Sequence, residues 1–494
     1  MNLVNDPWIP VVLSDESPHT AGLAELFQRA DQIRDLSVDP PRRVALMRLL
    51  ICIAQAALKG PSDEEKWYNC RGCISPEGFF YLQKWASAFE LRGPNPFMQV
   101  PGLRVDAGKK AVLDKLDCRL SSGNNATLFD HGGIPEGRCF HEAENAMNLL
   151  TFLNFSTGGK VGQAIWNNKK YSDSTFAAPC IKYAHTFIRG KNLLETLFFN
   201  LLTREGDVKG ITLMPNSRWG RPVWEQFPKN VKDTEAFGNA AETYLGRLVP
   251  LSRYLSLGDD SASSNCIIGP THKEYAIKHL PAFREPSATV VQNKKGDEYY
   301  MALSSDKHMW RQLGSVLSLK ESGSGTGGAI PLAGLVAYYS DFPETEVDIW
   351  VGGLETGAQA GKISDMLEWS FKIPVKQLME THLEKYRNGV ELAERGEYHL
   401  LNAVKTYFTH QKMDPKSLPT YKAKNLFWSE MDRQYDVLIK AANNPVEYLA
   451  DNWYGLVRQA MEDAYAQACP SQTPRQIQAY ALGMKLLRLK KPEE

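Results

Sequence analysis

The pattern of apolar residues changes once along the chain, near Pro374, and this change constrains the fold more than any other feature. Beyond it strand signals are few, and apolar side chains recur at helical spacing at Trp428, Met431, Tyr435, Leu438 and Ala442. The pairs Asn444-Pro445 and Thr473-Pro474 each supply a helix N-cap followed by a proline at the first helical position. The pattern predicts a C-terminal bundle of about four helices over 374–494.

The part before this change mixes helical and strand patterns with many Pro, Gly and Asn residues. Helices are expected at 41–58, 76–90, 141–152, 191–203 and 306–319, and strands at 286–293, 297–303 and 346–351. A chain of 494 residues exceeds what one core usually holds. We therefore predict an α+β protein, with a large mixed domain over 1–373 followed by a helical bundle over 374–494.

Charge and cysteine content exclude little. Lys plus Arg and Asp plus Glu both number 57, so any surface for a polyanion must be local. The eight cysteines show no framework spacing and 1–15 has no leader pattern, which predicts a reduced, cytoplasmic protein. The most apolar helix, at 43–58, contains Arg48 and Gln55 and is too short to span a bilayer, so no membrane partner is expected.

Two glycine-rich stretches resemble nucleotide-binding loops but have the wrong spacing or context. In WVGGLETGAQAGK, from Trp350 to Lys362, three residues rather than four separate the last two glycines, and Ile363 follows the lysine where a phosphate loop has Ser or Thr. A helix is expected to begin at Lys362. The run Gly323–Gly328 follows a helical pattern instead of a strand, so its match to G-x-G-x-x-G predicts no dinucleotide site.

Motifs for catalysis and metal binding are incomplete. Asn145 stands where a zinc-protease helix that begins with His141-Glu142 needs its second histidine. Cys70 and Cys73 form a lone C-x-x-C. Dispersed residues leave open a zinc site made of Cys139, His141, Cys266 and His272, and a cryptic hydrolase that uses His131, His141, Glu142 or Cys139. Because no set assembles a nucleophile, a base and an orienting group, we expect no catalytic residue, no metal and no cofactor.

A local basic segment favours nucleic acid. From residue 157 to 232 there are 12 Lys or Arg against 5 Asp or Glu. It begins at Phe155–Lys160 (FSTGGK), where paired glycines permit close approach of a ligand and Lys160 is available to a phosphate. A second basic turn, Asn293–Asp297 (NKKGD), lies between two expected strands. Taken separately, each turn is also explained by a solvated surface lysine.

Together and in this order, these fragments resemble the CasA family, the large subunits of the type I-E CRISPR surveillance complex Cascade. The likeness extends over most of the chain and combines individually weak pieces in collinear order. They are Asp6–Pro10 (DPWIP), Asn95–Gln99 (NPFMQ), Asn124–Gly137 around Phe129, Phe155–Lys160, Thr186–Gly190 (TFIRG), Lys294–Gly296 (KKG), Gly352-Gly353 with Gln359-Ala360, and the helical C-terminus.

The resemblance implies a subunit that binds the 5′ handle of a guide RNA and reads a short motif flanking a double-stranded DNA target from its minor groove. Its implied partners are the backbone, small and 5′-handle-capping subunits of Cascade, and a helicase-nuclease effector or a nuclease domain on another subunit. By resemblance the DNA-binding residues are Gly158, Gly159, Lys160, Lys294, Lys295, Ala358 and Gln359. The residues that anchor to guide RNA and neighbouring subunits are Phe129, Asp130 and His131.

The chain departs from the family pattern at two places. In the family a glutamine at the tip of a wedge meets the duplex, and the resemblance assigns this role to Gln359. Ala358 stands next to it where the family has a polar amide, and the loop from Gly353 to Gln359 is one residue longer, so the identity of the flanking motif does not carry over. The cysteine pairs that can hold zinc in the family are reduced here to Cys139 and Cys266. A purely structural scaffold that docks partner proteins without touching DNA is the alternative function.

Overall fold

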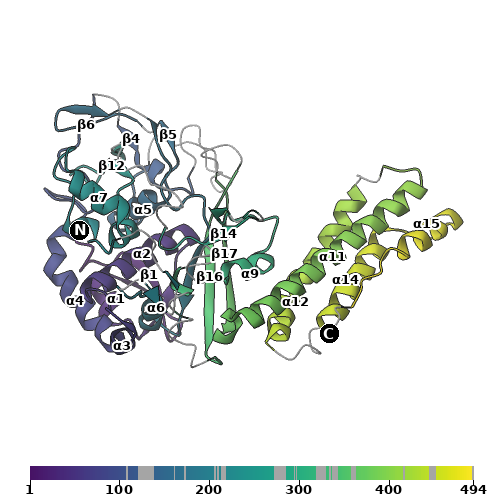
Figure 1. The fold of residues 1–494 in the computed structure, drawn as a ribbon. Coiled ribbons are helices and arrows are strands. Elements are labelled where there is room, and N and C mark those ends of the chain that lie inside the picture. Colours follow the sequence, from purple (N-terminus) through teal and green to yellow (C-terminus); the bar gives the residue numbers. More distant parts are fainter. Residues whose placement is uncertain are drawn as a thin grey trace. The chain divides into compact units, whose positions relative to one another are not determined.

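The structure, a computed structural model, describes most of the chain in two compact units (Figure 1). The described residues are 1–106, 110–120, 138–160, 162–171, 174–204, 207–208, 211–212, 218–271, 285–293, 295, 297–318, 330–332, 335, 343–357, 363–414, 418–443 and 452–491. Unit 1 comprises Met1–Asp306, Leu319–Asp341 and Glu346–Lys372, and unit 2 comprises Lys307–Ser318, Phe342–Thr345 and Ile373–Glu494. The two units are described separately.

The core of unit 1 forms around helix α2 (Pro40–Ala57). The side chain of Asp39 accepts a hydrogen bond from the backbone N–H of Arg42, and prolines occupy the first helical positions, so the start of the helix is well defined. Nearly all residues of α2 are buried, as expected for an apolar helix that is covered on every face. It packs against α4 (Ile74–Trp85), α5 (Glu142–Phe155) and strand β16.

Shorter elements cover this core. The other helices are α1 (Leu23–Gln28), α3 (Glu64–Asn69), α6 (Leu193–Phe199), α7 (Thr234–Glu242) and α8 (Tyr244–Leu248). One small sheet has the order β2 (Pro18–Ala21), β1 (Ile9–Leu13), β3 (Ile33–Leu36), and another has the order β12 (Arg253–Ser256), β13 (Asn265–Pro270), β4 (Ala111–Val112). Two-stranded ribbons are formed by β5 (Gly159–Lys160) with β8 (Ser174–Thr175), β6 (Ala164–Trp166) with β7 (Lys169–Tyr171), β10 (Asp207–Val208) with β11 (Ile211–Thr212), and β14 (Val290–Gln292) with β15 (Glu298–Tyr300).

The two longest strands among the described residues, β16 and β17, belong to a third sheet. Its order is β17 (Ile363–Pro374), β16 (Glu346–Thr356), β9 (His185–Arg189). The central strand β16 is buried over most of its length, and Arg43 of α2 stacks on the ring of Trp350 with 5.7 Å between the guanidinium carbon and the ring centroid. This sheet connects the core helix to the end of β16 at Thr356 and the start of β17 at Ile363.

Unit 2 is a helical bundle of α11 (Glu380–His410), α12 (Leu418–Ala442) and α14 (Tyr454–Ala468), with α15 (Pro474–Met484) packed on α11. A short helix, α9 (Leu313–Val316), follows a 3-10 turn at Met309–Gln312. Trp310 of that turn stacks with Tyr435 of α12, and its indole N–H donates to Asp432 at 2.7 Å. Thr473 forms a capping box with Gln476 at the start of α15, as its sequence predicts.

The predicted α+β class and the C-terminal bundle are confirmed. The helix predicted at 306–319 is shorter, with a 3-10 turn at Met309–Gln312 that continues directly into α9. The prediction that a helix begins at Lys362 is wrong, because strand β17 begins at Ile363. Gly352 and Gly353, which belong to the stretch that resembles a phosphate loop, lie inside β16. The pair Asn444-Pro445 lies outside the described residues, and the division into independently folding domains at 373/374 stays a prediction. None of the helices in the described residues could cross a membrane.

A candidate nucleic-acid interface

The predicted site residues are organised around strand β9, which lies at one end of the β17-β16-β9 sheet. On one edge it pairs antiparallel with β16, with Gly352 opposite His185. On its other edge it meets the segment that carries the β14–β15 hairpin. Three backbone hydrogen bonds define that contact: Ala184 N to Met301 O at 2.8 Å, Thr289 N to Ala184 O at 2.9 Å, and Thr186 N to Ser287 O at 2.9 Å. Two hairpins therefore flank the same strand.

The hairpin of β16 and β17 carries the predicted wedge. Ala358 and Gln359 lie outside the described residues, between the end of β16 at Thr356 and the start of β17 at Ile363. Gly353 has a φ of 149°, and a Cβ on it would lie 3.0 Å from the carbonyl oxygen of Tyr183. Glycine therefore serves the close packing of β16 beside β9 and not the shape of the turn.

The hairpin of β14 and β15 carries the predicted lysines. The Asn293 side chain organises its turn by accepting from the backbone N–H groups of Lys295 at 2.8 Å and Asp297 at 3.0 Å. The Asn293 amide also donates to the Asp297 carboxylate at 2.9 Å. Lys295 is exposed at this tip, whereas Lys294 lies outside the described residues.

The glycine-rich turn begins directly after α5. Gly159 has a φ of 108°, which side chains rarely adopt, and a Cβ on Gly158 would lie 2.9 Å from the backbone nitrogen of Ala177. Both positions therefore require glycine, one for conformation and one for close approach of the opposite strand. Lys160, the next residue, is exposed on β5.

A buried arginine that was not predicted from the sequence supports this turn by hydrogen bonds. Arg253 of β12 is 1% exposed and donates to the carbonyl oxygen of Thr157 at 2.6 Å. It also donates to the hydroxyl of Thr175 at 3.4 Å, on the opposite strand β8. Arg253 thus holds both strands of the ribbon that presents Lys160.

The turn also connects to β9 through the end of α5. Cys180 N donates to Asn154 O at 3.0 Å, and His185 binds the carbonyl oxygen of Cys180 through Nε2 at 2.9 Å. The rings of Phe155 and His185 meet edge to face with centroids 5.8 Å apart. The glycine-rich turn before Lys160, the β14–β15 hairpin and the β16–β17 hairpin are therefore attached to the same few residues at the start of β9. We call them the three predicted tips.

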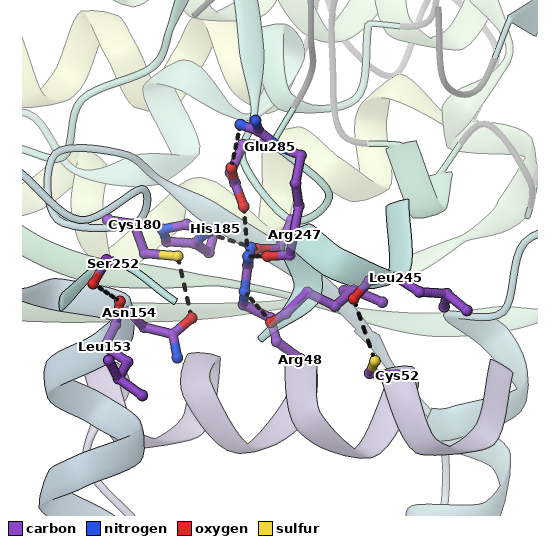
Figure 2. Close-up of polar contacts among 12 residues, drawn as sticks. Arg48, Cys52, Leu153, Asn154, Cys180, His185, Leu245, Arg247, Ser252 and Glu285 are labelled. Carbon is purple, nitrogen blue, oxygen red and sulfur yellow. Dashed lines mark hydrogen bonds and ion pairs between the residues drawn. The ribbon is translucent and has the colours of Figure 1, made fainter. Parts of the chain in front are cut away.

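A buried cluster of charged residues lies next to His185 at the start of β9 (Figure 2). Arg48 of α2 donates to the carboxylate of Glu285, and Arg247 of α8 donates to its other oxygen at 2.7 Å. Arg48 also donates to the hydroxyl of Ser287 at 2.8 Å, which contacts Nδ1 of His185 at 2.8 Å. The cluster connects α2, α8 and β9 to the residues that enter the β14–β15 hairpin.

Burial determines the protonation states in the cluster. It lowers the pKa of His185 to about 4, so the imidazole is neutral at physiological pH. Burial alone raises the pKa of Glu285, but Arg48 and Arg247 outweigh it and lower that pKa below its ordinary value. The sequence signal for this cluster was Arg48 itself, because a charge inside an apolar helix requires a buried partner.

The candidate catalytic and metal residues are not brought together among the residues that the structure describes. Glu142 is held by Arg92, with Nη2 to Oε1 at 2.9 Å. Cys139 is exposed, whereas Cys266 is buried and its pKa is raised to about 12 by burial. The described residues contain no cluster of three or more metal-binding side chains. Phe129, Asp130, His131 and His272 lie outside the described residues.

A cavity of about 1030 Å³ near β1, β3 and the starts of α2 and α5 is lined by several arginines, but each has an acidic partner. Arg34 pairs with Glu16, and Arg119 with Asp117. The remaining pairs are Arg42 with Asp39, Arg43 with Asp35, and Arg189 with Asp35 and Asp348. Its charge is thus compensated internally. Because Arg189 belongs to this network, the basic excess of 157–232 is not all available to a phosphate.

Comparison with known sequences identifies the class of protein. Residues 2–464 match the sequence profile of the family described as CRISPR-associated protein Cse1, so the chain is a CRISPR-associated protein. It belongs to the Cse1 family. A relative from Thermus thermophilus, "CRISPR-associated protein CasA/Cse1", is 28% identical over 335 residues, which make up 64% of this chain and 60% of the relative. The chain thus spans less than two thirds of that relative's length in the match.

Solved structures share the fold over nearly the whole chain. Thermobifida fusca Cse1 is 19% identical with a TM-score of 0.82, over 99% of this chain and 98% of that one. A chain of a "CRISPR RNA-guided surveillance complex" is 16% identical with a TM-score of 0.73, over 99% of both chains. At these identities the likeness shows a common fold.

Proposed function

We propose that this protein is the large, non-catalytic subunit of a type I-E CRISPR RNA-guided surveillance complex. In that role it reads a motif that flanks a double-stranded DNA target from the minor groove. It then wedges the duplex open to start R-loop formation and helps to recruit the helicase-nuclease. Membership of the Cse1 family and the fold shared with a chain of such a complex support the proposal.

The observation that carries the proposal is the common attachment of the three predicted tips. The glycine turn with Lys160, the hairpin with Lys294 and Lys295, and the hairpin with Gln359 all connect to the start of β9. Residues that contact one short piece of duplex must be held at fixed mutual positions. A frame braced by the buried Arg48–Glu285 pair meets that requirement.

Groove chemistry agrees with the residue types. The minor groove presents a degenerate hydrogen-bond code, so a site made of glycine backbone groups and a lysine tolerates several flanking motifs. Base pairing with the guide RNA then discriminates between target sequences. A glutamine inserted at the duplex end must offset a few kcal/mol of lost stacking. Its amide then hydrogen-bonds a displaced base edge. We assign that wedge to Gln359, with Ala358 beside it.

Assembly with guide RNA is assigned to a different part of the chain. Phe129, Asp130 and His131 are proposed to anchor the 5′ handle of the guide and the neighbouring Cascade subunits. The small, backbone and 5′-handle-capping subunits of Cascade are proposed as further partners of the protein. No cofactor is needed for these roles.

The salt dependence of DNA binding tests the assignment of the lysine hairpin. In the assembled complex, Lys294→Glu with Lys295→Glu should weaken capture of a flanked duplex target and reduce the slope of log affinity against log salt by about one to two. Lys84→Glu, on the exposed face of α4, is a single-substitution control for each lysine and should leave the slope unchanged. An unaltered slope in the double variant would refute DNA contact by the hairpin and favour a scaffold role.

A further inference from the structure

Phe176 is a large apolar side chain left open to solvent beside the glycine turn. It is 64% exposed and follows β8, the strand paired with Gly159 and Lys160. Water-exposed phenylalanine contributes nothing to the core, and the surrounding ribbon is polar. The proposed role of the turn does not account for this ring.

The pairing register places Phe176 directly opposite Gly158. Gly159 pairs with Thr175 and Lys160 with Ser174, and the bond from Ala178 N to Ser156 O at 2.8 Å continues the same register past the end of β8. The atoms nearest to a Cβ built on Gly158 are backbone atoms of 175–177, which agrees with that pairing. No side chain at 158 is therefore present to cover the ring.

Alternation along the strand determines which way the ring points. The hydroxyl of Thr175 accepts from the buried Arg253, so Thr175 faces inward. Adjacent residues of a strand point to opposite faces, and residues opposite each other on paired strands point to the same face. Phe176, Ser174 and Lys160 therefore share the outer face of the ribbon, with the ring diagonal to the lysine.

We propose that Phe176 is a further DNA-binding residue that packs on sugar and base edges of the flanking duplex while Lys160 meets a phosphate beside it. The inference rests on the proposed function, since it uses the same duplex. Apolar side chains that enter the minor groove are a general device of proteins that bend or open DNA.

Phe80 of α4 provides a matched control, because it is also 64% exposed. In the assembled complex, Phe176→Ala should weaken capture of a flanked duplex by about tenfold, the scale of one lost aromatic contact to a base. Phe176→Trp should restore most of it, and Phe80→Ala should have no effect. Binding of a complementary single strand that lacks the flanking duplex should be the same for all variants.

The outcomes separate this inference from the function on which it rests. Unchanged duplex capture by Phe176→Ala, with loss in Lys294→Glu/Lys295→Glu, overturns the role of the ring and leaves the proposed function standing. Unchanged capture in both overturns the proposed function as well. If Phe176→Ala loses affinity equally for the duplex and the single strand, or if the complex fails to assemble, Phe176 belongs to a contact between subunits and the inference is refuted.

Discussion

Substitution of Glu285 by glutamine tests whether the buried cluster holds the interface together. The change keeps the shape of the side chain but removes the negative charge that faces Arg48 and Arg247. Both arginines are almost fully buried, and a guanidinium does not lose its proton in a protein. Glu285→Gln therefore leaves two buried positive charges without a counter-ion.

The expected cost follows from that burial. Breaking a buried ion pair by removing one partner costs about 3–5 kcal/mol. Arg48 keeps neutral acceptors, the carbonyl of Leu248 at 3.0 Å and the hydroxyl of Ser287, so we expect a value near the lower end. Glu16→Gln is the control, because the Arg34–Glu16 pair is exposed by 57% and 76% and such pairs contribute about 0–1 kcal/mol.

Hydrogen exchange of the β9 backbone amides is the suitable assay, since a chain of two units need not unfold in one transition. Glu285→Gln should lower the opening free energy of β9 by about 3 kcal/mol, and the amides of α14 in unit 2 should exchange as before. If β9 opens within about 1 kcal/mol of its value in Glu16→Gln, the cluster does not brace the strand, and the reasoning is refuted.

Two further predictions follow from buried groups and close contacts. The pKa of His185 is about 4 in the folded protein and about 6.5 in the unfolded chain. The contribution of His185 to stability is therefore complete above pH 6.5 and decreases toward pH 4, by up to about 3 kcal/mol. The free energy of unfolding of His185→Gln should lack this decrease. Gly158→Ala places a Cβ 2.9 Å from the backbone of Ala177 and should strain the ribbon by about 1–3 kcal/mol, with weaker duplex capture, whereas Gly72→Ala meets nothing within 4 Å and should bind as the wild type.

The sequence predicted what depends on local pattern. Helical spacing identified the bundle, Thr473-Pro474 identified the start of α15, and the turn residues of Asn293–Asp297 identified the lysine hairpin. It failed at Ile363, where a strand begins, because a strand exposed on one side has a mixed pattern that also fits a helix.

Contacts far apart in the chain were not predictable. Arg253 reaches the glycine turn 96 residues away, and Glu285 meets Arg48 across 237 residues. Such residues become partners only in the folded tertiary structure, although the arginine within an apolar helix indicated that a buried acidic or polar partner must exist. The exposure of Phe176 likewise depends on its pairing with Gly158, which the sequence does not specify.

The opening of the target duplex beside the flanking motif is the most direct test of the account. A fluorescent adenine analogue placed at the first target base pair reports unstacking when the assembled complex binds. The account predicts that Gln359→Ala abolishes this signal on a fully paired target and that a target with that base pair already mismatched restores R-loop formation. An undiminished unstacking signal in Gln359→Ala would contradict it.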